Sequence, residues 1–201
     1  MKKLVILLLG FAIPFCMTSN ALAFSWATDM SEIYGAGGLD VAIPGSEYDV
    51  YSSIADPWGG TINFDNPVQH LVVGSGWLDW SHGYTGSILF SQYLPSIRLS
   101  FDKPITAFGF YAEPNTFDWF DVTLGLSDGS TDTKSVYGYY AAEFFGFTGG
   151  GVDWLEISTT DYNGFGFGEM VQGPVVPEPS TLMLLGTGLL GLGAFRFRRK
   201  K

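Results

Sequence analysis

The sequence predicts an all-β protein, an antiparallel β-sandwich of the jelly-roll type, with an N-terminal signal peptide and one C-terminal hydrophobic helix. Three observations favour this fold class. Short β-prone runs are separated by Gly, Pro, Asn and Asp, and long amphipathic helical patterns are absent. Apolar and polar residues alternate within several runs, as at 97–101 and 122–126. Glycine, with 27 residues, and aromatic residues, at 16%, are both abundant.

The candidate strands follow one another at short intervals along the chain. Within the run 97–101, Ile97, Leu99 and Phe101 share one face, and the residues between them share the other. The pair Asp128 and Gly129 separates two further runs and predicts a hairpin turn. Strands at this spacing are typical of a two-layered sandwich. The expected runs are 39–43, 61–64, 87–90, 97–101, 105–111, 120–126, 131–137, 152–159 and 165–171.

Residues 1–23 have the pattern of a secretory signal peptide. Two lysines follow the initiating methionine, an apolar stretch comes next, and Ala21 and Ala23 occupy the −3 and −1 positions of a cleavage site. Cys16 is the only cysteine and leaves with this peptide. We therefore expect a mature chain without disulfides, thiol nucleophiles or cysteine-based metal sites.

The body, expected at 24–172, is long enough for one domain with a core of its own. It holds 19 of the 20 acidic residues but only three of the 10 basic residues, which gives it a net charge of −16. This balance excludes nucleic acid as a partner, because phosphate contacts need lysine and arginine. An acidic body attracts divalent cations instead.

The C-terminal segment joins a proline-rich stretch, a short apolar run and a cluster of bases. We expect 173–179 to be a stiff spacer and 180–201 to be a hydrophobic tail. The apolar run at 181–195 spans roughly 22 Å as a helix, whereas a hydrocarbon core is about 30 Å thick. It is short for a permanent anchor, and the bases after it favour a body outside the cytoplasm. The layout is typical of a processed sorting tail, with an ordinary membrane anchor as the alternative.

The order of these parts resembles the PEP-CTERM sorting signal of Gram-negative bacteria. Pro177, Glu178 and Pro179 provide the motif, and a glycine-rich apolar span and terminal bases follow. This resemblance implies that an exosortase, a transpeptidase-like membrane protease, recognises the three motif residues. It also implies transient anchoring in the inner membrane, cleavage, and delivery to the cell surface or beyond, commonly alongside exopolysaccharide production.

The segment 76–86 is the most distinctive part of the body. Exposed aromatic rings on a sandwich can stack on sugar rings, so Trp77, Trp80 and Tyr84 are candidate glycan contacts, with Asp79 or His82 fixing hydroxyl groups. The alternative is that the tryptophans pack in the core or under a loop, and this alternative is favoured. A serine–histidine–aspartate triad is not recognisable from such scattered residues.

Three aromatic segments resemble the sandwich domains that precede PEP-CTERM tails. They are 101–115, 144–147 and 164–169, and the resemblance runs from Trp80 onward. Ile157 matches an I-x-I strand of those domains, but Leu155 replaces the first isoleucine. The resemblance implies the fold and carries no settled biochemical activity.

Glu113 and Glu169 each end an aromatic strand and are candidate functional carboxylates. A glycosidase pair needs two carboxylates roughly 5–10 Å apart, one of them with a raised pKa. Ca²⁺ is the other candidate, since it prefers oxygen ligands, although no Asp-x-Asp-x-Asp-Gly loop is present. Both side chains can equally cap strand ends or accept backbone hydrogen bonds.

The prediction that follows is an exported surface or matrix protein whose non-catalytic sandwich contacts exopolysaccharide. No cofactor is expected, apart from possible Ca²⁺ at Glu113 and Glu169. The alternative is a secreted glycan-active hydrolase that uses the same two carboxylates.

Overall fold

The computed structural model describes residues 24–176 and Gly186. Within them the body is almost entirely β-structure, and every strand-to-strand ladder is antiparallel. The strands are β1 (Ser25–Trp26), β2 (Leu39–Asp40), β3 (Val50–Ala55), β4 (Thr61–Val72), β5 (Ser87–Phe90), β6 (Ser96–Pro114), β7 (Trp119–Leu126), β8 (Thr131–Tyr137), β9 (Glu143–Thr159) and β10 (Phe165–Gln172). The helical elements are α1 (Met30–Gly35) and the single 3-10 turn η1 (Ser81–Gly83).

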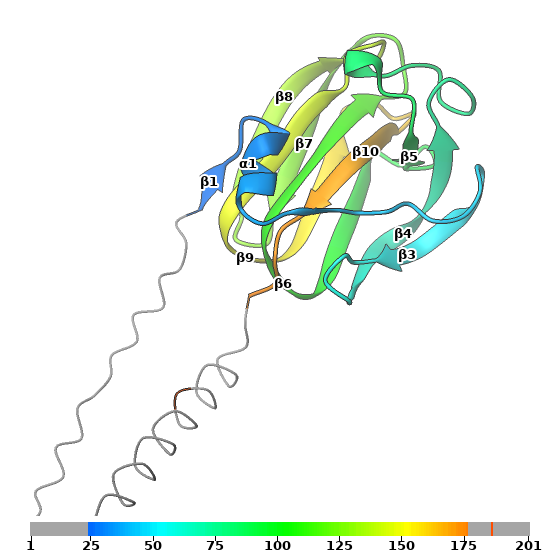
Figure 1. Ribbon diagram of the computed structural model, residues 1–201. Coiled ribbons are helices and arrows are strands. Elements are labelled where there is room, and N and C mark those ends of the chain that lie inside the picture. Colours follow the sequence, from blue (N-terminus) through cyan, green and yellow to red (C-terminus); the bar gives the residue numbers. More distant parts are fainter. Residues whose placement is uncertain (1–23, 177–185, 187–201) are drawn as a thin grey trace, which may run out of the picture.

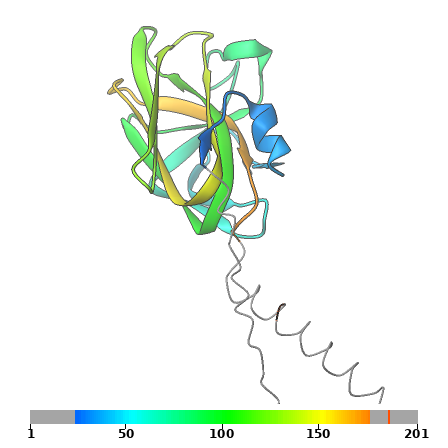
Figure 2. The same cartoon turned by 90° about the vertical axis from the view of Figure 1, so that its left-hand side faces the viewer.

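One hydrogen-bonded sheet curls round so that its parts face each other across the core (Figures 1 and 2). The first half of β6 pairs with β4, and its second half pairs with β10. Since β5 joins β4 to β10, these four strands close a ring of ladders. The long strand β9 lies along both halves of β6 and carries β7 and β8 on its other side. The predicted antiparallel β-sandwich is therefore confirmed.

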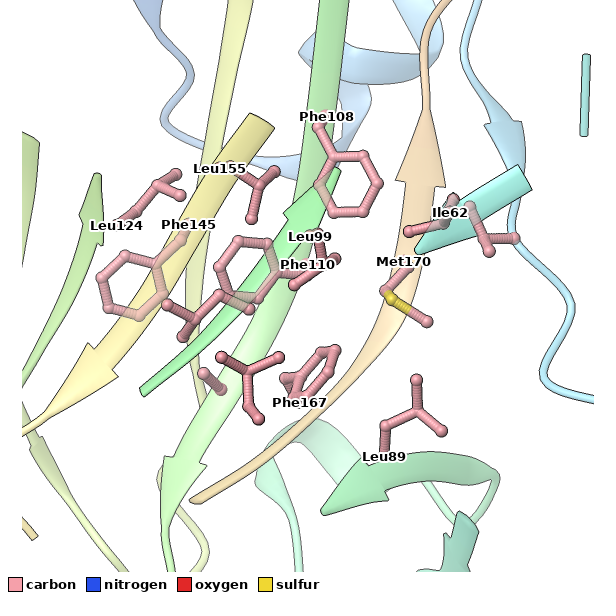
Figure 3. Packing of buried hydrophobic residues seen from close by; sticks show 14 of the residues in the cluster. Ile62, Leu89, Leu99, Phe108, Phe110, Leu124, Phe145, Leu155, Phe167 and Met170 are labelled. Carbon is pink, nitrogen blue, oxygen red and sulfur yellow. The ribbon is translucent and has the colours of Figure 1, made fainter. Parts of the chain in front are cut away.

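Phenylalanine and branched aliphatic side chains fill the space between the layers (Figure 3). The predicted alternation holds in β6, where Ile97, Leu99 and Phe101 are all buried. Phe110 of β6 stacks on Phe145 of β9 with ring centroids 5.7 Å apart. Burying a large apolar side chain contributes roughly 1.5–3 kcal/mol, so this core replaces the disulfides that the body lacks.

The hairpin between β7 and β8 turns at Asp128 and Gly129, as the sequence predicts. Gly129 has φ of +89°, a backbone conformation that glycine adopts without strain. The Asp128 carboxylate accepts a hydrogen bond from the Ser130 N–H at 2.8 Å. The turn therefore has the side-chain and backbone chemistry that its two residues suggest.

The short helix α1 was not predicted. Asp29 caps its N-terminus by accepting a hydrogen bond from the Ser31 N–H at 2.8 Å. Ile33 is its one buried residue and rests against Gly109 of β6, where a side chain would collide with it. A six-residue helix with a single inward side chain leaves no periodic pattern to detect.

The chain after β10 remains hydrogen-bonded to β6 as far as Val176. The Gly173 N–H bonds to the carbonyl of Ala107, and the Val176 N–H bonds to the carbonyl of Pro104. Residues 173–176, predicted as the first part of the spacer, thus continue the ladder beside β6. Among the described residues, no helix is long and apolar enough to cross a membrane. The signal peptide with Ala21 and Ala23, the motif 177–179 and the predicted C-terminal helix lie outside the described residues.

Candidate functional site

The loop between β4 and β5, residues 73–86, is called here the tryptophan loop. Its two tryptophans are buried, with Trp77 at 7% and Trp80 at 2% exposure. They pack with Ile88 and Phe90 of β5, and Gly166 of β10 leaves room for the Trp77 ring. Neither indole offers a free face to a sugar, which corrects the prediction of glycan contact at these two residues. Both tryptophans are packed in a hydrophobic cluster, as the alternative interpretation of the sequence expects.

Each buried indole donates its N–H to one of the two predicted carboxylates. Trp77 Nε1 donates to Glu113 Oε2 at 3.1 Å, and Trp80 Nε1 donates to Glu169 Oε1 at 2.7 Å. A buried indole N–H needs an acceptor, and a carboxylate is a strong one. The glutamates therefore hold the tryptophan loop against β6 and β10.

Glu113 is buried, at 1% exposure, and both of its oxygens are engaged. Oε1 accepts the Ala141 N–H at 3.0 Å, in addition to the Trp77 bond. Burial raises the pKa of Glu113 to about 7, with the nearby Asp79 carboxylate adding to the effect. Asp79 accepts the Tyr140 N–H through Oδ1, whereas its buried Oδ2 has no partner. Asp79 and Glu113 therefore bind the backbone of residues 140 and 141 to the tryptophan loop and to β6.

Glu169 lies at a more open place than Glu113. Its side chain is 20% exposed and also contacts His82, whose Nε2 lies 3.0 Å from Glu169 Oε2. Glu169 has φ of +52° and His82 has φ of +44°, and the register of β10 against β6 shifts between Gly168 and Val171. Such backbone strain in residues other than glycine is most frequent at functional sites.

Glu113 and Glu169 are each bound by a different tryptophan of the loop. Trp77 donates to Glu113 and Trp80 donates to Glu169, and Glu169 lines the cavity described below. Within residues 24–176, no group of three or more His, Cys, Asp or Glu side chains is placed to hold a metal ion.

The cavity beside Glu169 has a volume of about 570 Å³ and is called here the tyrosine pocket. Tyr34 of α1, Tyr84 of the tryptophan loop and Tyr111 of β6 line it, together with the carboxylates of Asp40 and Glu169. Two predicted site residues, Tyr84 and Glu169, therefore meet here. Sequence reasoning missed the other three, because they come from segments far apart in the chain.

A second surface feature is a row of exposed rings where β7 begins and β8 ends, called here the aromatic ridge. Ring centroids lie 5.3 Å apart between Trp119 and Tyr137, 5.2 Å between Phe117 and Tyr139, and 4.5 Å between Tyr139 and Tyr140. Phe117, Trp119 and Tyr140 are 56%, 64% and 60% exposed. Contiguous exposed apolar surface marks interaction sites.

A signal for the ridge was present in the sequence. In β7 the even-numbered residues Val122, Leu124 and Leu126 face the core, so odd-numbered residues face outward. Phe117 and Trp119 have the outward parity. Extending the alternation backward from 122 predicts the exposure of Trp119, whereas Phe117 lies in the bend before β7.

These features define an all-β sandwich body. Residues 175–200 match the PEP-CTERM protein-sorting motif, and Pro177, Glu178 and Pro179 fall within the match. The motif implies export, processing by an exosortase, and transient membrane anchoring through the C-terminal tail.

The comparison with curated proteins gives no match. Among solved structures, the chain is similar to CBM35 from Cellvibrio japonicus Abf62, at 12% identity and a TM-score of 0.34, covering 64% of this chain and 100% of that one. It is also similar to a family two carbohydrate esterase from Cellvibrio japonicus, at 11% identity and a TM-score of 0.29, covering 65% of this chain and 36% of that one. A likeness of this degree says nothing about the ligand of this chain.

Proposed function

We propose that the body is a non-catalytic extracellular domain that contacts exopolysaccharide through the aromatic ridge. The observation that carries this proposal is the set of neighbouring surface rings in which Phe117, Trp119, Tyr139 and Tyr140 are exposed and Tyr137 is partly buried. In this proposal, sorting through the PEP-CTERM motif places the ridge at the surface or in the matrix of a Gram-negative bacterium.

Sugar rings have apolar C–H faces that stack on aromatic rings, and their hydroxyl groups remain free to hydrogen-bond. The ridge supplies both kinds of partner, because three of its rings are tyrosines with phenolic hydroxyls. A row of rings suits an extended polymer better than a single small sugar. The net charge of the body disfavours strongly anionic polymers, so the proposal specifies a neutral or weakly charged polysaccharide.

Affinity gel electrophoresis tests the ridge. The purified protein is run through gels that contain the polysaccharide isolated from its own host, and retardation is compared with Trp119→Ala. We expect the variant to bind on the order of tenfold more weakly, since an aromatic contact contributes about 1 kcal/mol or more. Tyr162→Ala is the matched control, because Tyr162 is 86% exposed and lies outside the ridge.

Equal retardation of Trp119→Ala and Tyr162→Ala would rule out the ridge as the contact surface. Size-exclusion chromatography of the same proteins provides a second readout. If Trp119→Ala changes the oligomeric state but not the retardation, the ridge is a protein–protein interface and the glycan proposal fails.

The proposal treats the body as non-catalytic, against the alternative of a hydrolase using Glu113 and Glu169. The occupied oxygens and full burial of Glu113 support this choice. The test is the release of reducing ends from the host polysaccharide by wild type and by Glu113→Gln. Release by wild type that Glu113→Gln abolishes, in a folded variant, would establish the hydrolase.

The cleavage step has its own test, which is mass spectrometry of the mature C-terminus in the surface fraction. We expect the chain to end near Pro177, Glu178 and Pro179. An intact Lys201 in that fraction would show that the tail is retained there.

A further inference from the structure

We propose that the tyrosine pocket binds a small organic ammonium ion. This inference is independent of the glycan proposal, because the pocket and the ridge are built from different residues. It concerns the cavity between α1, the strand β2 and the residues after it, the tryptophan loop and the strained part of β10.

The walls of the pocket combine flat aromatic faces with soft apolar side chains. Tyr34, Tyr84 and Tyr111 contribute the rings, and Met30 and Met170 contribute thioethers. The ring face of an aromatic side chain attracts a cation within about 6 Å of its centroid. The volume of about 570 Å³ lies within the range of small-molecule sites, which is about 300–1,000 Å³.

The charged groups of the pocket are all negative. Asp40 and Glu169 line it, and no lysine or arginine does among the described residues. Two of the few bases of the body lie elsewhere: Arg98 pairs with Glu156 at 3.0 Å, and Lys134 lies 4.0 Å from Asp132. A cationic ligand therefore meets two carboxylates with no lysine or arginine in the pocket lining, and the one basic side chain that contacts them is His82, whose Nε2 lies 3.0 Å from Glu169 Oε2.

The acidic side chains of the pocket contribute to raising the pKa of each of its three phenols. Burial first, and then the Glu169 carboxylate, raise the pKa of Tyr84 and of Tyr111. The pKa of Tyr34 is raised to about 12, mainly because its hydroxyl donates to the Asp40 carboxylate. All three phenols stay neutral at ordinary pH, and the Tyr111 ring also contacts His82 and Phe144, with ring centroids 4.7 Å and 5.6 Å apart.

The carboxylates suit a diffuse cation better than a metal ion. Asp40 accepts the Tyr34 hydroxyl, and Glu169 is contacted by Trp80 and His82. Ca²⁺ needs six to eight oxygen ligands within about 2.6 Å, and three of the four carboxylate oxygens here are already in hydrogen-bonded contacts. An alkylated ammonium ion does not need direct coordination by each oxygen, because its charge is spread over C–H groups. These groups also pack on the rings and thioethers.

Isothermal titration calorimetry with choline tests the proposal. The uncharged isostere 3,3-dimethyl-1-butanol is the ligand control, because it keeps the shape and removes the charge. We expect saturable binding of choline and none of the isostere. Calcium chloride forms a third arm, in which we expect no competition with choline.

Glu169→Gln keeps an acceptor for Trp80 while removing the charge, and we expect about tenfold weaker choline binding. Asp153→Asn is the matched control, since it removes one carboxylate at an exposed position outside the pocket. Near-UV circular dichroism establishes that each variant is folded. Tyr34→Leu provides a second pocket variant at a 48% exposed position, with severalfold weaker binding expected.

Absence of saturable choline binding to wild type would overturn the proposal, and so would equal binding of the isostere. If Glu169→Gln does not fold, Tyr34→Leu decides, and an unchanged affinity in that variant contradicts the pocket assignment. Competition by calcium would assign the carboxylates to a metal ion instead.

Discussion

The tryptophan loop and the aromatic ridge contain similar side chains in opposite surroundings. Trp80 in the loop is 2% exposed and donates its N–H to Glu169, whereas Trp119 on the ridge is 64% exposed. For Trp80 and Trp77, a carboxylate from another strand lies within reach of the indole. The comparison teaches that the number of aromatic residues in a segment does not reveal their role. A structural role is revealed by a carboxylate that lies within hydrogen-bond distance of the indole N–H.

The difference also explains where structural stability and binding capacity reside. Residues 73–86 contain little regular structure, so the loop depends on its two anchored indoles and on the carboxylates of Glu113 and Glu169 to stay in place. The ridge sits on the paired strands β7 and β8 and needs no such anchors. Its rings are therefore free to contact a ligand.

The largest effect is expected from Trp80→Ala. Removing this buried ring leaves a cavity and an unpartnered Glu169 oxygen, so we expect a loss of about 3–5 kcal/mol in the free energy of unfolding. Urea denaturation followed by circular dichroism measures it. A loss below about 1 kcal/mol would show that the loop does not rely on its tryptophan anchors.

The next effect is a pH dependence that comes from Glu113. Its pKa is about 7 in the folded protein, against an ordinary value of 4.5, so the unfolded chain releases this proton first as the pH rises. Glu113 therefore lowers stability progressively between pH 4.5 and 7 and by a constant amount above that range. The total is on the order of 3 kcal/mol, because one pKa unit corresponds to about 1.4 kcal/mol.

Glu113→Gln removes this titration, and the Asp153→Asn variant is the control for the loss of one exposed carboxylate. The measurement is the unfolding free energy of wild type minus that of Glu113→Gln, from pH 4.5 to 8. We expect this difference to fall up to about pH 7 and then to level off. A difference that does not vary with pH would contradict the buried, proton-holding state of Glu113.

A smaller effect is expected from Trp80→Phe. The ring volume is largely kept, but the N–H to Glu169 is lost, and hydrogen bonds to charged groups contribute about 1.5–3 kcal/mol. Because His82 still contacts Glu169, we expect the lower end of that range. Thermal denaturation compares this variant with Trp80→Ala. An identical loss in both variants would mean that the hydrogen bond to Glu169, and not the packing of the ring, positions the loop.

The smallest effect on stability is expected from Trp119→Ala. Exposed substitutions away from a core or a cap change stability by about 0.5 kcal/mol or less. The ridge variant should therefore unfold within error of wild type. A loss as large as that of Trp80→Ala would show that the ridge serves the fold.

The sandwich could be predicted from the sequence because alternation records which side of each strand is buried. Ile97, Leu99 and Phe101 lie in the core as that alternation requires. Trp77 and Trp80 lie in a loop, where no periodicity shows which way a side chain points. Their acceptors lie 36 and 89 residues away along the chain. Residues so far apart in sequence come into contact only through the tertiary fold, which the local sequence pattern does not reveal.

The candidate site was only partly predictable for the same reason. Glu113 and Glu169 were recognised as unusual acids at aromatic strands, but their separation depends on the closure of β6 against β10. The tyrosine pocket needs α1, which is too short to leave a helical pattern. Of its five aromatic and acidic lining residues, the sequence singled out Tyr84 and Glu169.

The most direct test of the contrast between the two regions is affinity electrophoresis of Trp119→Ala beside Trp80→Phe on the host polysaccharide. Both variants remove part of one tryptophan, and both are expected to stay folded. We expect Trp119→Ala to lose most of its retardation and Trp80→Phe to be retarded like wild type. Wild-type retardation of Trp119→Ala, or its loss in a folded Trp80→Phe, would contradict the division into a structural loop and a binding ridge.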